Sequence, residues 1–224
     1  MKFFHYEQNT DPRPMPEGGA ALYFDTFYTH LGNFFLLNLL TLLCSLPVFT
    51  IPAAICAMNR VCGQLIRKGY CFLAKTYFEE FRQSLFRSLT LGSLYTAFGV
   101  SGFICICYGI AYEGSGIGAV SKIFGFVEIG ISFLLSGWSF LFLSIQNLPA
   151  RRVLSNTLVM LILEPKCSLK IWTVTTAAAG LLWGLFPFSL ILLLIFPVFV
   201  QYTLCWITRD AIQRRIINRA ANSE

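Results

Sequence analysis

Charged residues are scarce in this chain. Only 12% of its 224 residues are Asp, Glu, Lys or Arg, about half of what a soluble globular protein carries. The 22 phenylalanines alone outnumber the 11 acidic residues. This composition excludes intrinsic disorder and an ordinary water-soluble enzyme, and it predicts an integral membrane protein.

Sequence motifs for catalysis and cofactor binding are missing as well. The chain has only two histidines, His5 and His30, and none of its eight cysteines forms a CxxC pair, so a Cys/His zinc site is not expected. No HExxH, no Gly-x-Ser-x-Gly and no Gly-x-x-x-x-Gly-Lys-Ser/Thr sequence occurs. We therefore expect no enzymatic activity, no catalytic residue, no metal and no cofactor.

The basic residues are grouped beside long apolar runs. The net charge is +6, and most Lys and Arg residues lie within positions 60–87, 151–170 and 209–219. Segments rich in Lys and Arg stay on the cytoplasmic side of a membrane, whereas nucleic-acid binding needs basic residues spread over one soluble surface. We therefore expect a lipid bilayer as the environment, no nucleic-acid partner and a cytoplasmic C-terminus.

The first uncharged run, residues 26–59, is too long for a single helix across a hydrocarbon core of about 30 Å. Pro47 and Pro52 interrupt it, since proline removes a backbone donor and clashes with the preceding turn. We expect one helix over residues 24–46 and a second over residues 52–66. Whether the run crosses the membrane once or twice is open.

Four further helices are expected in the middle of the chain. Residues 75–87 predict an amphipathic helix that lies in the membrane interface with its aromatic face toward lipid. Residues 88–112 and 123–148 are each long enough for one crossing, and a glycine-rich outer loop joins them. Residues 153–163 are too few to cross and predict a short helix in the interface or against the bundle.

The uncharged run of residues 171–208 has basic residues at both ends. One helix of that length would measure about 57 Å, so two crossings that turn near residues 184–188 fit the bilayer better. Pro197 is expected to kink the second of these helices. The Gly180-x-x-x-Gly184 spacing gives a weak indication of close helix approach.

Together these segments predict an all-α, polytopic transmembrane helix bundle with about six spans and amphipathic interfacial helices. Five spans are the alternative. The expected organisation is a polar N-terminal tail over residues 1–25, a single transmembrane helical domain over residues 26–208 and a basic cytoplasmic tail over residues 209–224. The oligomeric state cannot be inferred from the sequence.

Residues 31–50 and the start of the next helix resemble a known family. In that family an asparagine in the first helix is followed by a Leu-Pro-x-x-Thr step and an alanine-rich second helix. The matching residues here are Asn38, Leu46, Pro47, Thr50, Ala53 and Ala54. The chain thus resembles the YesL family (DUF624) of bacterial membrane proteins, although Pro52, which completes a helix-break motif with Leu46 and Pro47, replaces the family's usual glycine.

This resemblance implies a protein of the bacterial cytoplasmic membrane with no established biochemical activity. Members of the family are often encoded beside carbohydrate ABC-transporter genes, which implies an accessory role in carbohydrate uptake and a sugar ABC-transporter permease as a partner. The alternative is a small-solute transporter or channel, because helices broken by proline resemble those that line solute sites.

Several polar residues inside the expected spans are candidates for a structural or functional role. Asn38 can form an interhelical hydrogen bond or contact a ligand, and Thr50 can satisfy backbone groups freed between the prolines. Glu128 is the one ionisable group well inside an expected span, which favours a function, but it lies close enough to Lys122 to reach the outer interface instead. Arg60 is expected to extend toward lipid headgroups.

Overall fold

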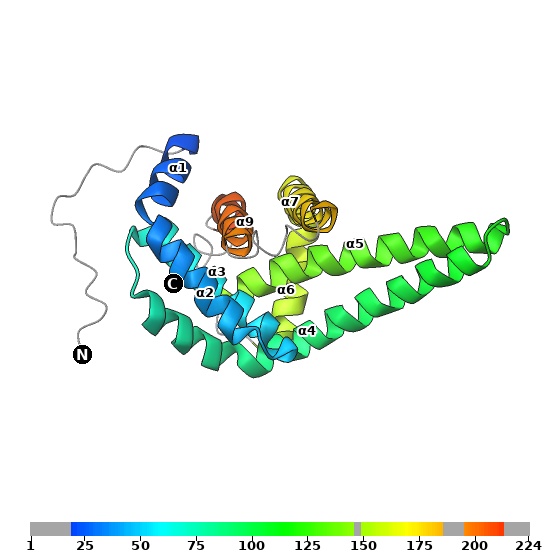
Figure 1. Cartoon of the computed structure of the whole chain (residues 1–224), viewed down its shortest axis with the longest axis horizontal. Coiled ribbons are helices and arrows are strands. Elements are labelled where there is room, and N and C mark those ends of the chain that lie inside the picture. The colour runs from blue at the N-terminus through cyan, green and yellow to red at the C-terminus, as the bar shows by residue number, and fades with distance from the viewer. Residues whose placement is uncertain (1–18, 146–148, 186–194, 213–224) are drawn as a thin grey trace.

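The computed structural model describes residues 19–145, 149–185 and 195–212 (Figure 1). Within these ranges the chain forms helices joined by short segments and contains no strand, which confirms the expected all-α architecture. In chain order the helices are α1 (Gly19–Thr29), α2 (Leu31–Cys44), the 3₁₀ helix η1 (Val48–Thr50), α3 (Ile51–Lys68), α4 (Leu73–Ala111), α5 (Gly116–Ile145), α6 (Ala150–Leu163), α7 (Pro165–Gly184) and α9 (Phe196–Ile212).

The N-terminal apolar run begins with two helices where one was expected. α1 and α2 meet at His30 with a bend of 70° between them, so the prediction of one continuous helix over residues 24–46 is wrong. Neither helix alone is long enough to cross a bilayer, since α2 has only 14 residues, or about 21 Å. The pair is therefore either one broken span or a segment that enters and leaves on the same side.

The polar tail expected over residues 1–25 is shorter than predicted, because α1 already begins at Gly19. Residues 1–18 lie outside the described part of the chain. Packing explains the additional helix, since the ring of Tyr23 lies 5.0 Å from the ring of Tyr202 in α9. A contact between the two ends of the chain thus extends the helical domain beyond what local polarity indicates.

The break between the two prolines is present as predicted. α2 ends at Cys44 and α3 begins at Ile51, with Pro52 in the first turn of α3, where a helix does not need its missing N–H. α3 ends at Lys68 and is capped by Gly69, whose φ of 71° is the left-handed conformation that closes many helices. The result is a helix of 18 residues, close to the expected residues 52–66.

α4 is one continuous helix of 39 residues, so the prediction of separate helices over residues 75–87 and 88–112 is wrong. No proline or glycine occurs in residues 73–91, and nothing in the local sequence forces a break. Aromatic side chains such as Phe86, which is 80% exposed, point outward. The buried side of the same stretch is mostly polar, and it comprises Tyr77, Glu80, Ser84, Ser88 and Leu91.

α4 and α5 form a long antiparallel hairpin that extends away from the other helices (Figure 1). Glycines allow the two backbones to touch: a Cβ atom on Gly125 would lie 2.4 Å from the carbonyl oxygen of Gly102, and one on Gly109 would lie 2.7 Å from that of Gly118. Small residues at such an interface give close helix packing in membranes. We call these four residues the glycine seam.

The tip of the hairpin is a short turn over residues 112–115 and not the longer glycine-rich loop expected. Lys122 Nζ donates a hydrogen bond to Glu113 Oε1 over 2.8 Å, and this contact lowers the pKa of the Glu113 carboxyl group. Because Lys122 belongs to the first turns of α5, the ion pair ties the turn to that helix.

Hydroxyl groups connect the helices at the base of the hairpin. Tyr95 Oη of α4 lies 2.5 Å from Ser139 Oγ of α5, which lies 3.0 Å from Thr157 Oγ1 of α6. Trp138 Nε1 donates to Ser168 Oγ of α7 over 3.0 Å. All five residues are buried, and interhelical bonds of this kind contribute about 0.6 kcal/mol each, and up to about 2 kcal/mol.

Three helical segments are long and apolar enough to cross a membrane: η1 with α3, α4 and α5. The bent pair α1–α2 raises the number to four, so the described residues do not reach the six spans expected. α7 and α9 do not meet the same criterion within the described residues, and most of the expected turn at residues 184–188 lies outside them. Figure 1 looks nearly along α9 and across the hairpin, so these two parts are steeply inclined to each other.

The C-terminal helices also differ from the expectation in detail. The short helix expected over residues 153–163 is present as α6, but Pro197 lies in the first turn of α9 and does not kink it. No described atom lies within 4 Å of a Cβ placed on Gly180 or Gly184, so this pair makes no close approach to a described helix. α9 extends to Ile212, into the region expected to be a tail.

The glycine seam predicts which glycines of α4 and α5 can be replaced. Gly125→Ala places a methyl group against the backbone of Gly102 and should destabilise the hairpin by about 1–3 kcal/mol, the usual cost of overpacking. Gly99→Ala is the matched control, because a Cβ there meets no described atom within 4 Å. Reversible unfolding in mixed micelles measures both, and equal stability of the two variants would contradict the seam.

The topology of the C-terminal region can be measured with reporter fusions. If α7 and α9 each cross the membrane, fusions after Lys170 and Arg209 should report one compartment and a fusion after Leu185 the other, because basic residues lie at both outer ends. The same compartment at all three positions would show that neither helix crosses.

Candidate functional site

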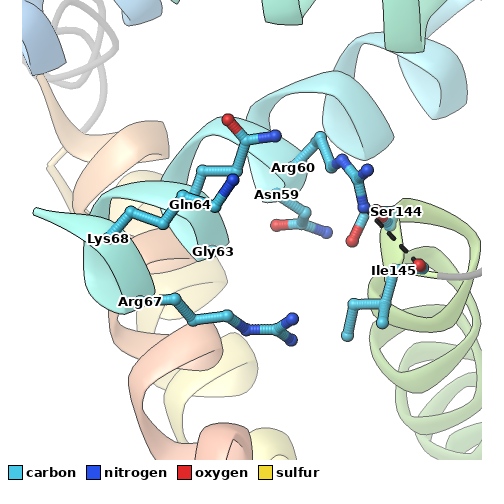
Figure 2. Close-up of a pocket in the computed structure, with 8 residues that line it drawn as sticks. All are labelled: Asn59, Arg60, Gly63, Gln64, Arg67, Lys68, Ser144 and Ile145. Atoms are coloured by element: carbon cyan, nitrogen blue, oxygen red, sulfur yellow. Dashed lines mark hydrogen bonds between the residues drawn. The ribbon is translucent and has the colours of Figure 1, made fainter. Parts of the chain in front are cut away.

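α3, α4 and α5 converge at the base of the hairpin, far from its tip. α3 packs along the first part of α4, where a Cβ on Gly92 would lie 2.4 Å from Pro52 Cγ. The C-terminal end of α5 meets the second half of α3 at the same place (Figure 2). The charged residues of α3 are therefore brought beside the end of another helix.

Arg60 joins the three helices. Its Nη1 atom donates a hydrogen bond to the carbonyl oxygen of Ser144 over 2.8 Å, and its Nε atom lies 3.8 Å from Glu80 Oε2. The last carbonyls of a helix have no partner within it and carry partial negative charge, so a guanidinium group there is favourable. The prediction that Arg60 extends to lipid headgroups is wrong, because these two contacts hold the side chain against the protein.

Glu80 is the acidic partner in this arrangement. Its side chain is 7% exposed, against 38% for Arg60. A carboxylate buried to this degree is costly unless a positive charge lies beside it. The ion pair therefore links α3 to α4 and leaves the Arg60 side chain partly exposed.

A pocket of about 130 Å³ opens beside Arg60 (Figure 2). Two more basic residues, Arg67 and Lys68, come from the last turn of α3, and Figure 2 shows the Arg67 side chain extending across the pocket toward α5. A second, smaller pocket shares several of these residues and adds Arg209 of α9. The residues that line the first pocket are Asn59, Arg60, Gly63, Gln64, Arg67, Lys68, Ser144 and Ile145.

Two amide side chains complete the pocket wall. Asn59 is buried, and its Oδ1 atom lies 3.8 Å from the Cys205 thiol of α9, which leaves the amide group positioned between the two arginines (Figure 2). Gln64 Oε1 accepts a hydrogen bond from the Cys71 thiol over 3.2 Å. Burial raises the pKa of Cys71, so it is a neutral donor near pH 7 and holds the Gln64 side chain in place.

The chemistry of this pocket favours an anion. It combines guanidinium and ammonium donors with amide groups, and an acid lies on one side only. Planar guanidinium groups match the oxygen atoms of carboxylates and phosphates. All eight cysteines are free thiols, and no group of three or more metal-ligating side chains occurs among the described residues.

The polar residues singled out from the sequence lie elsewhere. Asn38 is fully buried in α2. Thr50 Oγ1 lies 2.5 Å from the Cys44 carbonyl oxygen and 2.6 Å from that of Pro47, so its hydroxyl serves the turn between α2 and α3. Glu128 lies in the projecting part of α5.

The residues of the helix-break motif have different environments. Leu46 is 76% exposed in the turn, Pro47 precedes η1, and Pro52 packs on Gly92 of α4. Thr50 and Pro47 are thus brought together, but neither they nor Asn38 or Glu128 lines the basic pocket.

Sequence reasoning missed the pocket residues, although one signal was available. Arg60 interrupts an otherwise uncharged stretch from residue 26 onward, and its spacing from Arg67 is seven residues, which places both on the same face of α3. Glu80 lies within residues 75–87, on the polar side of the amphipathic helix expected there. Only the packing of α3 against α4 shows that its side chain points inward.

Helices of this length and apolarity, packed together around apolar core clusters with buried polar groups among them, define a multi-helix membrane protein. A family model described as "Protein of unknown function, DUF624" matches residues 34–106, which confirms the resemblance to this family. The match runs from α2 through most of α4 and includes Arg60, Arg67 and Glu80. Comparisons with curated proteins and with solved structures found no match.

The Arg60–Glu80 pair predicts a specific pattern of stability. Arg60→Met leaves a buried carboxylate and the end of α5 without a cation, and should cost about 1–3 kcal/mol, less than for a fully buried pair because Arg60 is 38% exposed. Adding Glu80→Gln should recover part of that loss. The free energies of unfolding of the two single variants and the double variant measure the coupling between Arg60 and Glu80. Arg82→Met, at an exposed position, is the control. If the losses of the two single variants simply add in the double variant, the pair has no energetic role.

Proposed function

We propose that the chain is a non-catalytic accessory protein of the membrane that binds another integral membrane protein through the α4–α5 hairpin. The observation that carries this proposal is the state of Glu128. Its Oε2 atom is buried and accepts no hydrogen bond from any residue that the structure describes. The Glu128 side chain as a whole is partly exposed. A carboxyl group without a partner is costly inside a bilayer, so a donor from a second protein that reaches the exposed part of the side chain would stabilise it.

The position of Glu128 supports docking along the side of the hairpin. It follows Gly116, the first residue of α5, by 12 residues, or about 18 Å along the helix axis. That distance places it near the middle of a 30 Å hydrocarbon core when the hairpin tip lies at one surface. Large apolar side chains surround this level and face outward, among them Phe103, Ile104, Phe124 and Phe126.

The family resemblance indicates the kind of partner. Because members are often encoded beside carbohydrate ABC transporters, the partner in this proposal is the permease of such a system, in the bacterial cytoplasmic membrane with the C-terminus of this chain in the cytoplasm. The chain has no P-loop sequence, so any ATP-driven step belongs to the partner. The accessory protein would contribute binding and positioning.

Glu128→Gln tests this proposal. The variant keeps the shape of the side chain but removes its charge, and recovery of the permease with the tagged protein from mild detergent should fall about tenfold or more, as for loss of one buried charged hydrogen bond. Glu113→Gln is the matched control, because this carboxyl group lies exposed at the tip of the same hairpin.

Undiminished recovery with Glu128→Gln would rule out this carboxyl group as the docking contact.

The second candidate function, a small-solute transporter, rests on the same residue, since an intramembrane carboxyl group can carry a proton. Proton-coupled solute flux in vesicles that hold the purified protein alone, lost in Glu128→Gln, would favour that candidate over the accessory role.

A further inference from the structure

We infer that the basic pocket between α3 and α5 binds the phosphate group of an anionic ligand, supplied by a lipid headgroup or by a soluble phosphate. Three cations line the pocket, Arg60, Arg67 and Lys68. Among the described residues, the one acidic group within ion-pair distance of any of them is Glu80, beside Arg60. The side chains around the pocket therefore carry two more positive charges than negative ones.

Helix ends account for only part of this excess. The C-terminal carbonyls of α5 are served by Arg60. Arg67 and Lys68 lie in the last turn of α3, where cations are favourable, but a helix end carries only about half an elementary charge. The Arg67 guanidinium extends away from its own helix end and across the pocket toward Ile145 (Figure 2).

The pocket has the size and donors that a phosphate needs. Its 130 Å³ is about ten times the roughly 10–15 Å³ that a single water molecule requires. Guanidinium groups two turns apart on α3 and the Asn59 amide converge on it (Figure 2). Arginine forks bind phosphate oxygens through paired hydrogen bonds, which gives both affinity and orientation.

The depth of the pocket fits a lipid headgroup. Ser144 follows Gly116 by 28 residues in α5, which corresponds to about 42 Å along the helix. A bilayer measures about 30 Å across its hydrocarbon core and about 40–45 Å with its headgroups. With the tip at one surface, the pocket lies at the headgroups of the opposite leaflet, where basic pockets between helices bind anionic lipids.

The test uses the purified full chain in detergent doped with phosphatidylglycerol or with zwitterionic phosphatidylcholine, and native mass spectrometry counts the lipid retained. We expect retention of phosphatidylglycerol over phosphatidylcholine. Arg67→Gln should weaken this retention about tenfold, because one charged hydrogen-bonding group is lost. Arg82→Gln, which removes the same charge from an exposed position on α4 outside the pocket, should change it less than twofold.

Equal retention of the two lipids, or equal losses in Arg67→Gln and Arg82→Gln, would overturn the site. Inorganic phosphate separates the two sources: displacement of phosphatidylglycerol by millimolar phosphate supports a soluble phosphate ligand, and lipid retention that phosphate does not displace supports the headgroup. Should Arg67→Gln fail to fold, Lys68→Gln removes a neighbouring charge from the same wall, and unchanged retention in it would count against the site.

Discussion

The contact of the Arg60 guanidinium with both Glu80 and the end of α5 is the interaction on which the arrangement of helices depends. The other contacts of α3 with α4 and α5 are largely apolar, as in the cluster that contains Met58, Tyr77 and Leu141, and apolar contacts are not directional. One side chain places a positive charge beside a buried carboxylate and donates a hydrogen bond to a free helix end. It thereby fixes the position of α3, and with α3 the basic wall of the pocket.

Polar side chains are buried among apolar ones in this protein, and many bulky apolar groups also face outward. In α4 the buried stripe consists largely of serines, tyrosines and Glu80, while phenylalanines face outward. In a lipid solvent apolar surface gains nothing from burial against more apolar surface, so hydrogen bonds and close backbone contacts hold the helices together. The chain from Tyr95 through Ser139 to Thr157 and the glycine seam are these two kinds of contact.

Composition and the positions of proline were sufficient to predict the helical class and the break before α3. Both are local properties: a proline acts on its own turn, and an apolar run acts through its length. The bend at His30 and the helical start at Gly19 could not be predicted in this way, since they depend on rings of α9 about 180 residues later in the chain. The same limit applies to Glu80, whose burial depends on α3 packing against its side of α4 and not on the pattern of its own helix.

The glycine seam has a mechanical consequence for the hairpin. Where two backbones touch with no side chain between them, one helix cannot slide along the other without driving carbonyl oxygens into Cα atoms, so relative motion is restricted to the pair as a whole. A displacement of the turn at residues 112–115 would then move both helices together and would change the positions of the hydroxyl groups of Tyr95 and Ser139 at the base of the hairpin. Binding at the tip of the hairpin would therefore shift the helices at its base, on the opposite side of the membrane, without unwinding either helix.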